Sequence, residues 1–391
     1  MRVGHISDIH IGVGASGPTP LSRFQDIEKI LDWTADKLIE EKVDLCLICG
    51  DLYKDAKVMF DRGTEETICV GNWLRKLSSA GIEVIVISGT PGHDSHAGYK
   101  FLEQMQIPHI SIRTKPGIIS YIPDLNIACL PGLNRSALLT QDEYKGLPPE
   151  QVHRIMTDKI TQLCMGMAAQ MPDDKPKILM AHMTYQGADK GFDDLLMQHE
   201  PILTREAVAA FDLVCLGHIH KPQIIDDKVF YSGPVERLSF NDETTIPGFW
   251  IHDVGVNKVL EIQPYPIFSR FIETPARRYV TLDLINYLAS DHFALDIQDA
   301  IVRLHYSCSE EFAQQLSRKQ IEKSLYDAGA FFVSEIKADI ERSDRARDNT
   351  VNESLSVPQA LGKWAVNQGI EAQEIEALKA MAVGLMEGEA S

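Results

Sequence analysis

The sequence contains no long apolar segment and little positive charge. None of its hydrophobic runs reaches the length of about 20 residues that a membrane-spanning helix needs, so we expect no membrane partner. The opening residues MRVGHISDIH have neither the apolar core of a signal peptide nor the character of a transit peptide, which favours a cytoplasmic location. The 38 lysines and arginines are outnumbered by 56 aspartates and glutamates. The resulting net charge of −18 argues against a protein that coats nucleic acid through its overall charge.

The sequence also lacks the paired cysteines of a disulfide framework. Its seven cysteines are odd in number and scattered through apolar stretches, as is typical of reduced thiols in a core. Cys46 and Cys49 have a C-x-x-C spacing, but they lie in the strand-like run DLCLICGD, where residues three apart point to opposite faces. We therefore interpret both as buried structural residues. A hydrophobic share of 44% indicates a globular protein, and 391 residues suffice for two or more domains.

The order of apolar runs and helical stretches predicts an α/β (α+β) protein. Strand-like and helical segments alternate up to about residue 265, ending in an expected hairpin of residues 249–255 with residues 258–266. After an expected break at residues 267–278, the order strand, strand, helix, strand predicts a small α+β domain. Polar residues 341–354 are typical of a linker. The predicted domains are therefore residues 1–268, 269–341 and 342–391.

The last segment predicts two amphipathic helices that are broken at Gly369. One apolar side of these helices would be formed by Trp364, Ile375, Leu378, Met381 and Leu385. Such helices either pack on their own domain or bind a partner.

Five segments that each follow a strand-like run carry imidazole or carboxylate groups. They are Asp8-Ile9-His10, Gly50-Asp51, His93-Asp94, His182 and Gly217-His218-Ile219-His220. Residues two apart in an extended stretch point to the same side, so Asp8 with His10, and His218 with His220, would form ligand pairs. Sites in α/β sheets form at the carboxyl ends of strands, where these groups are expected. The remaining histidines match no such segment and are interpreted as structural: His5, His96, His109, His153, His199, His252, His292 and His305.

Nitrogen and oxygen ligands without clustered thiolates suit Mn²⁺, Fe²⁺ or Zn²⁺ better than Ca²⁺. Two such cations, roughly 3.5–4 Å apart, can bind a phosphodiester, activate water and stabilise the departing oxygen. The five segments together therefore indicate hydrolysis at phosphorus.

The order D-x-H, GD, HD, H, GHxH resembles the calcineurin-like metallophosphoesterase superfamily over roughly residues 1–265. The resemblance implies a four-layer ββ-sandwich flanked by helices, with a dinuclear metal centre at one edge. By that pattern the ligands of one metal are Asp8, His10, Asp51 and His220, and those of the other are Asp51, His182 and His218. His93 would act on the phosphate as the catalytic acid or transition-state stabiliser, and Asp94 would orient it.

Two further segments resemble the SbcD-type DNA repair nucleases. HISDIHIG (residues 5–12) is similar to their opening motif, and SGPVER (residues 232–237) resembles a Y-S-G-S-x-E-R segment that would place Arg237 near the substrate phosphate. The α+β domain would be their capping domain, and the terminal helices would bind an SbcC-type coiled-coil ABC ATPase. The resemblance implies a homodimeric nuclease that depends on two metal ions, with Mn²⁺ expected first and Mg²⁺, Fe²⁺ or Zn²⁺ as alternatives. Such an enzyme is an exonuclease on double-stranded DNA ends and an endonuclease on single-stranded or hairpin DNA.

The sequence departs from the family pattern in two places. Where the family has GNH[DE], this chain has Gly92 in place of the asparagine that binds the second metal. A backbone carbonyl, a water or Thr90 would have to substitute, so we expect the second metal to bind more weakly. Residues 53–66 lack the usual His and Pro-Ser, so family contacts to substrate and dimer partner do not transfer to them.

Two alternatives remain open on the same scaffold. The acidic charge and the altered motif favour a small-substrate phosphodiesterase or phosphatase. The missing asparagine favours a catalytically weakened scaffold subunit. The chain continues for about 120 residues beyond the sandwich, which favours the nuclease because small-substrate enzymes usually stop there.

Overall fold

The computed structural model describes ten stretches of the chain: residues 1–12, 16–57, 64–92, 94–133, 146–191, 200–255, 265–283, 296–309, 317–341 and 355–388. The chain forms two compact units. The larger comprises Met1–Leu282, Asp291–Leu304 and Glu322–Ile336, and the smaller comprises Asp283–Ser290, His305–Ile321 and Lys337–Ser391. No described helix is long and apolar enough to cross a membrane.

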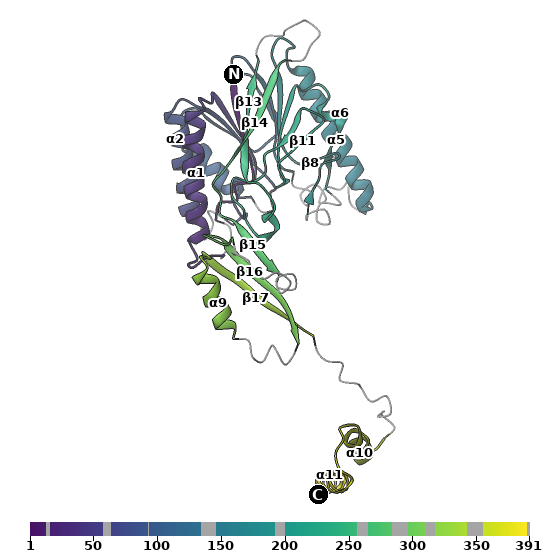
Figure 1. The fold of residues 1–391 in the computed structure, drawn as a ribbon. Coiled ribbons are helices and arrows are strands. Elements are labelled where there is room, and N and C mark those ends of the chain that lie inside the picture. The colour runs from purple at the N-terminus through teal and green to yellow at the C-terminus, as the bar shows by residue number, and fades with distance from the viewer. Residues whose placement is uncertain are drawn as a thin grey trace. The chain divides into compact units, whose positions relative to one another are not determined.

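The first sheet of the larger unit has six strands in the order β14-β13-β1-β2-β3-β4. Its parallel strands are β1 (Arg2–Ile6), β2 (Leu45–Cys49), β3 (Glu83–Ile87) and β4 (Ile110–Arg113). Strand β13 (Gly248–Val254) pairs antiparallel with β1, and β14 (Ile267–Glu273) pairs antiparallel with β13. The helices α1 (Ser22–Glu40) and α2 (Thr64–Ser79) cover its outer face (Figure 1), and α3 (His96–Gln104) follows β3. Strand β2 is buried throughout, which explains its continuous apolar run LCLIC.

The second sheet also has six strands, in the order β11-β12-β10-β7-β6-β5. These are β11 (Gln223–Ile225), β12 (Val229–Tyr231), β10 (Leu213–Gly217), β7 (Lys177–His182), β6 (Asn126–Leu130) and β5 (Gly117–Ile119). Helices α5 (Pro149–Gln170) and α6 (Arg205–Val208) pack on its outer face (Figure 1). Strands β8 (Thr184–Tyr185) and β9 (Ile202–Leu203) form a short separate pair, and η3 (Phe240–Asp242) is a single 3₁₀ turn.

Three hydrophobic cores lie between these layers. One joins α1 and α2 to the first sheet, one lies between the two sheets, and one joins α5 and α6 to the second sheet. The order helix, sheet, sheet, helix confirms the predicted α/β sandwich flanked by helices. In both sheets the central strands are parallel, so their carboxyl ends gather at the same edge.

The structure contradicts the expected hairpin and the expected break after it. Strand β13 pairs with β14, Ile267–Glu273, where the sequence predicted a break. Of the segment predicted to pair with β13, residues 258–264 lie outside the described residues. Strand β14 is the edge strand of its sheet, its residues IFSRFIE mix apolar and polar side chains, and Phe268 is 74% exposed. Such a half-exposed edge strand has the composition of a linker, which explains the error.

The predicted strand-strand-helix-strand order after the sandwich is present. Strands β15 (Tyr279–Asp283), β16 (Ile301–Ser309) and β17 (Phe332–Glu341) form a three-stranded sheet, and α9 (Arg318–Asp327) precedes β17. The predicted linker lies almost wholly outside the described residues. It is followed by α10 (Val357–Asn367) and α11 (Ala372–Gly388), with Gly369 between them in a left-handed conformation. On the predicted apolar side Ile375 is buried, whereas Trp364, Met381 and Leu385 are exposed.

Candidate dinuclear metal centre

The loops that follow β1 and β2 run side by side and carry the first candidate ligands. The amide of Asp8 donates to the carbonyl of Gly50 over 3.1 Å, and the amide of His10 donates to the carbonyl of Asp51 over 3.0 Å. Asp8, His10 and Asp51 all have positive φ, of 53°, 45° and 50°. The predicted extended geometry for the Asp8–His10 pair is therefore wrong, because left-handed residues turn the two side chains together. Such rare backbone conformations persist where the surrounding structure holds them, often at functional sites.

Two triplets of potential ligand atoms meet at this edge of the sandwich. Asp8, His10 and His220 form one, and Asp8, Asp51 and His182 form the other, each with its ligand atoms within 4.8 Å of one another. The carboxylate of Asp51 lies between two imidazoles. Its Oδ2 is 3.5 Å from Nε2 of His10, and its Oδ1 is 3.3 Å from Nε2 of His182. Ligands from four strand ends thus converge in one place, with both carboxylates buried at their centre.

Neighbouring groups fix the orientation of these side chains. Nδ1 of His182 is 2.9 Å from the carbonyl oxygen of Cys49, which turns Nε2 toward Asp51. Nδ1 of His220 is 3.2 Å from Oδ1 of Asp242. The carboxylate of Asp8 accepts hydrogen bonds from the amide of His218 over 3.0 and 3.2 Å. Contacts of this kind hold metal-ligating imidazoles and carboxylates in position in known metal sites.

The electrostatics of His182 fit a bound cation. Its Nε2 is buried and faces the carboxylate of Asp51. Burial opposes protonation of this imidazole, but the negative charges of Asp51 and Asp8 outweigh burial and raise its pKa to about 10. The site therefore attracts positive charge strongly, and imidazole and carboxylate donors suit Mn²⁺, Fe²⁺ or Zn²⁺. When bound, a pair of such ions supplies charge for binding phosphate and lowers the pKa of water.

Two glycines leave the room that this convergence needs. Gly50 has φ of +88°, and a Cβ there would lie 2.3 Å from Nδ1 of His182. A Cβ on Gly89 would lie 1.9 Å from Oδ1 of Asp51. Neither position accepts a larger residue without displacing a candidate ligand. The glycines of the GD and Gly89–Asp94 segments therefore have a steric role that the sequence pattern did not reveal.

The loop between β3 and α3 carries the altered motif. Asp94 is buried, and its carboxylate accepts hydrogen bonds from the amides of Gly89 and Tyr53, over 2.8 and 3.1 Å, and from the Tyr99 hydroxyl over 2.6 Å. The carboxylate thus holds this loop against β2 and α3. His93 lies outside the described residues, so its predicted contact with Asp94 stays a prediction.

Thr90 and Gly92 were the candidate substitutes for the missing asparagine. The amide of Thr90 donates to Oδ1 of Asp51 over 2.7 Å, and its carbonyl accepts from the amide of Asp94 over 2.8 Å. Thr90 therefore contacts the centre through its backbone. Gly92 is exposed, and a Cβ there would meet nothing within 4 Å. This position has space for a side chain.

The structure adds residues that sequence reasoning missed. Nε2 of His218 is 2.7 Å from Oε2 of Glu200, and His218 belongs to neither of the two ligand triplets. Asp242 contacts His220 from η3. Nothing in the spacing of Glu200 or Asp242 marked them, because each comes near its histidine only through the fold of the loops.

The guanidinium of Arg237 contacts backbone carbonyls, and its predicted place near the substrate phosphate stays a prediction. Its Nε donates to the carbonyl of Thr245 over 3.1 Å, and its Nη1 donates to the carbonyl of Arg277 over 3.4 Å. The neighbouring Glu236 is buried, 3.3 Å from the guanidinium of buried Arg23. The SGPVER segment therefore links α1 to the strand connection before β15.

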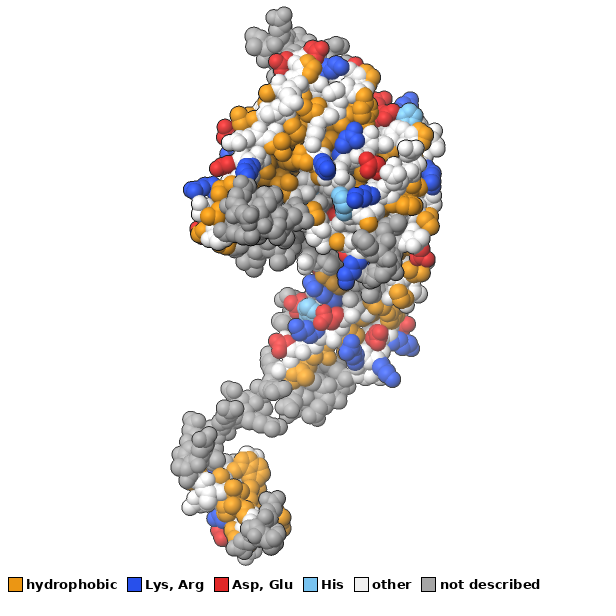
Figure 2. Space-filling view, turned by 180° about the vertical axis from the view of Figure 1, so that it is seen from behind, with side chains coloured by type: hydrophobic (Ala, Val, Ile, Leu, Met, Phe, Trp, Pro, Cys, Tyr) orange, Lys and Arg blue, Asp and Glu red, His pale blue; other side chains and the backbone are white. Residues whose placement is uncertain are grey.

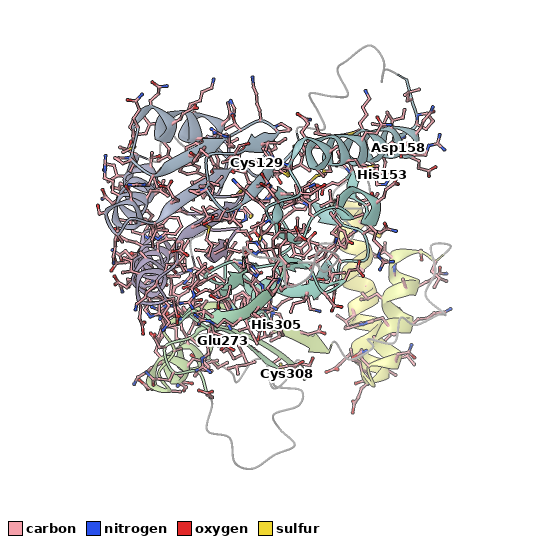
Figure 3. The ribbon with its side chains drawn as sticks, turned by 90° about the horizontal axis from the view of Figure 1, so that it is seen from above. Cys129, His153, Asp158, Glu273, His305 and Cys308 are labelled. Carbon is pink, nitrogen blue, oxygen red and sulfur yellow. The ribbon has the colours of Figure 1, made fainter. Side chains whose placement is uncertain are left out.

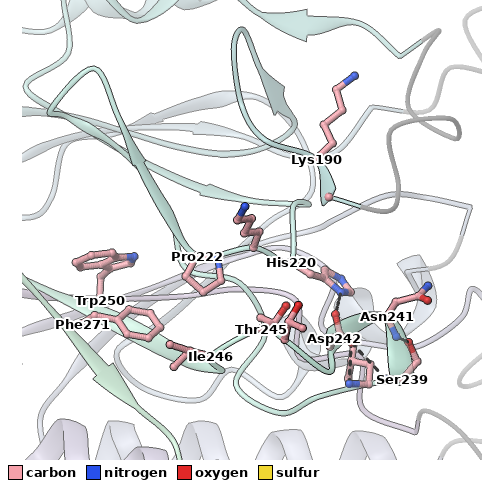
Figure 4. A pocket seen from close by; sticks show the side chains of 14 residues that line it. Lys190, His220, Pro222, Ser239, Asn241, Asp242, Thr245, Ile246, Trp250 and Phe271 are labelled. Atoms are coloured by element: carbon pink, nitrogen blue, oxygen red, sulfur yellow. Dashed lines mark hydrogen bonds and ion pairs between the residues drawn. The ribbon is translucent and has the colours of Figure 1, made fainter. Parts of the chain in front are cut away.

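A cavity of about 610 Å³ opens beside His220 (Figure 4). Lys190 and Lys221 line it, and Trp250 and Phe271 lie at the end away from His220. The ammonium group of Lys221 forms an ion pair with Asp189. The cavity thus connects a candidate metal ligand with positive charge and with two aromatic rings.

Comparison with known proteins identifies the family of this chain. A family model described as calcineurin-like phosphoesterase matches residues 1–222. Among solved structures, the chain is similar to TT1561 of Thermus thermophilus, with 14% identity and a TM-score of 0.34, over 69% of this chain and 98% of that chain. It is also similar to a dimetal phosphatase from Danio rerio, with 10% identity and a TM-score of 0.34, over 64% of this chain and 92% of that chain. Since the family match spans more than half of the sequence, the chain belongs to the calcineurin-like phosphoesterases, a family of hydrolases that act on phosphoesters.

Proposed function

We propose that the protein is a DNA nuclease of the SbcD type that hydrolyses phosphodiester bonds with two divalent cations, Mn²⁺ first among them. The observation that carries the proposal is the convergence of Asp8, Asp51 and three imidazoles from four strand ends. Two ions held there would neutralise a phosphate, and phosphoryl transfer depends mainly on such neutralisation and on positioning. In this proposal the enzyme degrades double-stranded DNA from its ends and cuts single-stranded or hairpin DNA internally.

The cavity beside His220 supports a nucleotide substrate. Lys190 and Lys221 line this cavity, and lysine side chains are common contacts to a nucleic acid backbone. Trp250 and Phe271 line its far end, and aromatic side chains in such a cavity are common contacts to bases. These local features fit DNA despite the net charge of −18, because carboxylates that bind metals are part of that count.

The C-terminal helices support a partner protein. Figure 2 shows hydrophobic side chains gathered on the surface of α10 and α11, and they include Trp364, Val366, Met381 and Leu385, exposed by 49–70%. An apolar helical surface of this kind binds other helices. We propose that it binds the coiled coil of an SbcC-type ABC ATPase in DNA repair or recombination. The proposed nuclease acts as a homodimer.

The nuclease is tested by comparing two histidine variants on two substrates. His182→Asn removes a candidate ligand, whereas His109→Asn changes a histidine that precedes β4, at the opposite end of the parallel strands. With Mn²⁺, the wild type and His109→Asn should degrade end-labelled linear DNA and hydrolyse bis(p-nitrophenyl) phosphate, and His182→Asn should do neither. His93→Ala should retain metal and lose DNA cleavage.

The two substrates separate the nuclease from its alternatives. Hydrolysis of the small ester without cleavage of linear, single-stranded or hairpin DNA would refute the nuclease and leave the small-substrate enzyme. Equal activity of the wild type and His182→Asn would refute the metal centre itself. Absence of stoichiometric Mn²⁺ in the wild type would indicate a scaffold subunit.

The partner is tested with the exposed side chains of α10 and α11. Full-length Trp364→Ala/Leu385→Ala should bind a purified SbcC-type ATPase at least about tenfold more weakly, as expected when central apolar anchors are lost. A matched variant, Lys379→Ala, removes a polar side chain from α11. Equal affinity of all three proteins in calorimetry would contradict this binding surface.

A further inference from the structure

The core between the two sheets contains three polar side chains in one place. His5 on β1, His252 on β13 and Cys215 on β10 are all fully buried. One potential ligand atom from each lies within 4.8 Å of the other two. The three residues come from both sheets, and all three side chains point into the space between the sheets. This cluster is separate from the triplets at the sandwich edge and shares no residue with them.

Each imidazole of this cluster uses one ring nitrogen and leaves the other unused. Nε2 of His5 is 3.0 Å from the carbonyl oxygen of Leu216, and Nδ1 of His252 is 2.7 Å from the hydroxyl of Ser269. Nδ1 of His5 and Nε2 of His252 are buried and have no hydrogen-bond partner among the described residues. Buried polar atoms normally have a partner, because leaving one without it costs free energy. Two imidazoles with such unused nitrogens, clustered with a thiol, therefore call for a ligand.

Aromatic rings keep this region dry. The ring of Phe230 packs against His252 with centroids 4.8 Å apart, and the ring of Trp250 lies 6.3 Å from it. The indole nitrogen of Trp250 donates to the carbonyl of Tyr231 over 2.9 Å. Burial also lowers the pKa of His5 to about 4, so its imidazole is neutral at neutral pH. Because a carbonyl oxygen only accepts, Nε2 of His5 carries the proton and the unused Nδ1 has a lone pair.

We propose that Cys215, His5 and His252 form a second metal site, which binds a soft cation, Cu⁺, within the sandwich. One thiolate and two imidazoles prefer Cu⁺ or Zn²⁺ among the biological cations. Binding of Cu⁺ releases the thiol proton of Cys215, so that the thiolate and the ion cancel in charge. Zn²⁺ would leave one uncompensated positive charge in a dry core, which is costly. Two bonds of roughly 2.0–2.3 Å to one ion hold its ligand atoms at most about 4.6 Å apart, so atoms that already lie within 4.8 Å of one another need only a small approach.

The site would bind its ion while the protein folds. The ligands are fully buried, so an ion enters most readily before the two sheets close. It would then tie β1 and β13 of the first sheet to β10 of the second. The proposed role of this site is structural. It is independent of the proposed nuclease because the cluster shares no residue with the two edge triplets, and a sulfur neighbour distinguishes its ion from any ion bound there.

The test measures copper in the full-length protein made in copper-supplemented medium and purified without oxygen. After a wash with a Cu⁺ chelator, the wild type should retain about one copper per chain, and X-ray absorption should show one sulfur and two nitrogen neighbours. Cys215→Ser should lose the copper, with about tenfold less metal and no sulfur neighbour. Cys129→Ser is the matched control, since Cys129 is a buried core thiol on β6 outside every cluster of potential ligands among the described residues (Figure 3).

A second variant covers the case in which Cys215→Ser does not fold. His252→Gln removes an unused ring nitrogen and keeps the sulfur, and it should also lose the copper. The proposal is overturned if the wild type retains no copper after the wash. It is also overturned if the bound copper has only nitrogen and oxygen neighbours, or if Cys215→Ser or His252→Gln retains as much copper as Cys129→Ser.

Discussion

The edge of the sandwich and its interior each contain a buried histidine, but the pKa of the one at the edge is raised and the pKa of the one in the interior is lowered. His182 at the edge and His5 in the interior are both fully buried, yet burial lowers the pKa of His5 to about 4, and the pKa of His182 is raised to about 10. The difference comes mainly from Asp51, which lies beside His182, because the charge of Asp8 raises the pKa of both imidazoles. Burial alone therefore does not set the charge of an imidazole here, and the nearest carboxylates decide it.

The backbone conformation also differs between the edge and the interior. His5 and Cys215 lie in regular strands. Asp8 and His218 follow three residues later in the chain, past the ends of these strands, and have φ of 53° and 97°. The same strands, β1 and β10, thus supply both clusters. Regular pairing places residues in the interior, and left-handed turns at the strand ends gather ligands at the edge.

The strongest test of this comparison removes the central carboxylate. Asp51→Asn should lose more than about 100-fold in phosphodiesterase activity, since residues that merely orient metal ligands already change affinity or activity by roughly 10–100-fold. Bound Mn²⁺, measured by equilibrium dialysis, should fall in parallel. Asp124→Asn, in an exposed loop of the second sheet, is the control and should match the wild type. Full activity of Asp51→Asn would show that the edge is no metal centre.

The next test separates backbone strain from crowding at the edge. Gly50 and Gly81 both have positive φ, of +88° and +79°, but only at Gly50 would a Cβ meet another residue, His182. Gly81→Ala should cost about 1–2 kcal/mol in the free energy of unfolding from left-handed strain. Gly50→Ala should cost roughly 2–5 kcal/mol, because overpacking adds to that strain. Urea unfolding measures both, and equal costs would contradict the tight fit around His182.

A third test uses pH to examine the interior. Because the pKa of His5 falls from 6.5 to about 4 on folding, the unfolded chain binds more protons between these values. The contribution of His5 is therefore present above pH 6.5 and is lost as the pH falls through 4, by about 3 kcal/mol at 1.36 kcal/mol per pH unit. After both proteins are treated with a chelator, the unfolding free energy of His5→Gln should not show this decrease between pH 6.5 and 4. Parallel curves of unfolding free energy against pH for the wild type and His5→Gln would refute the assignment.

The smallest expected effect is a gain at the altered motif. Gly92→Asn should raise Mn²⁺ affinity several-fold, at most about tenfold, by restoring an amide ligand where a side chain meets no obstacle. Stability should change by less than about 1 kcal/mol, as is usual at an exposed position. Isothermal calorimetry and thermal unfolding measure the two quantities. Gly166→Asn, also free of contacts within 4 Å, is the control and should leave Mn²⁺ affinity unchanged.

The strands were predictable because parallel strands buried on both faces have continuous apolar sequences, as LCLIC and LVCLG show. The candidate ligands were predictable because each follows such a run. Strand β14 was missed because this edge strand mixes polar and apolar residues without regular alternation. Glu200 and Asp242 were missed because no local pattern ties them to His218 or His220.

The sequence by itself determined the layers of the sandwich and the positions of the ligands at the ends of its strands, because periodic burial and short motifs are local properties of the chain. The tertiary structure decided which groups meet. It brought Asp51 between His10 and His182, turned Arg237 toward backbone carbonyls, and gathered His5, Cys215 and His252 from two sheets. These contacts join residues up to about 250 positions apart, and only the pairing and packing of the two sheets sets their distances.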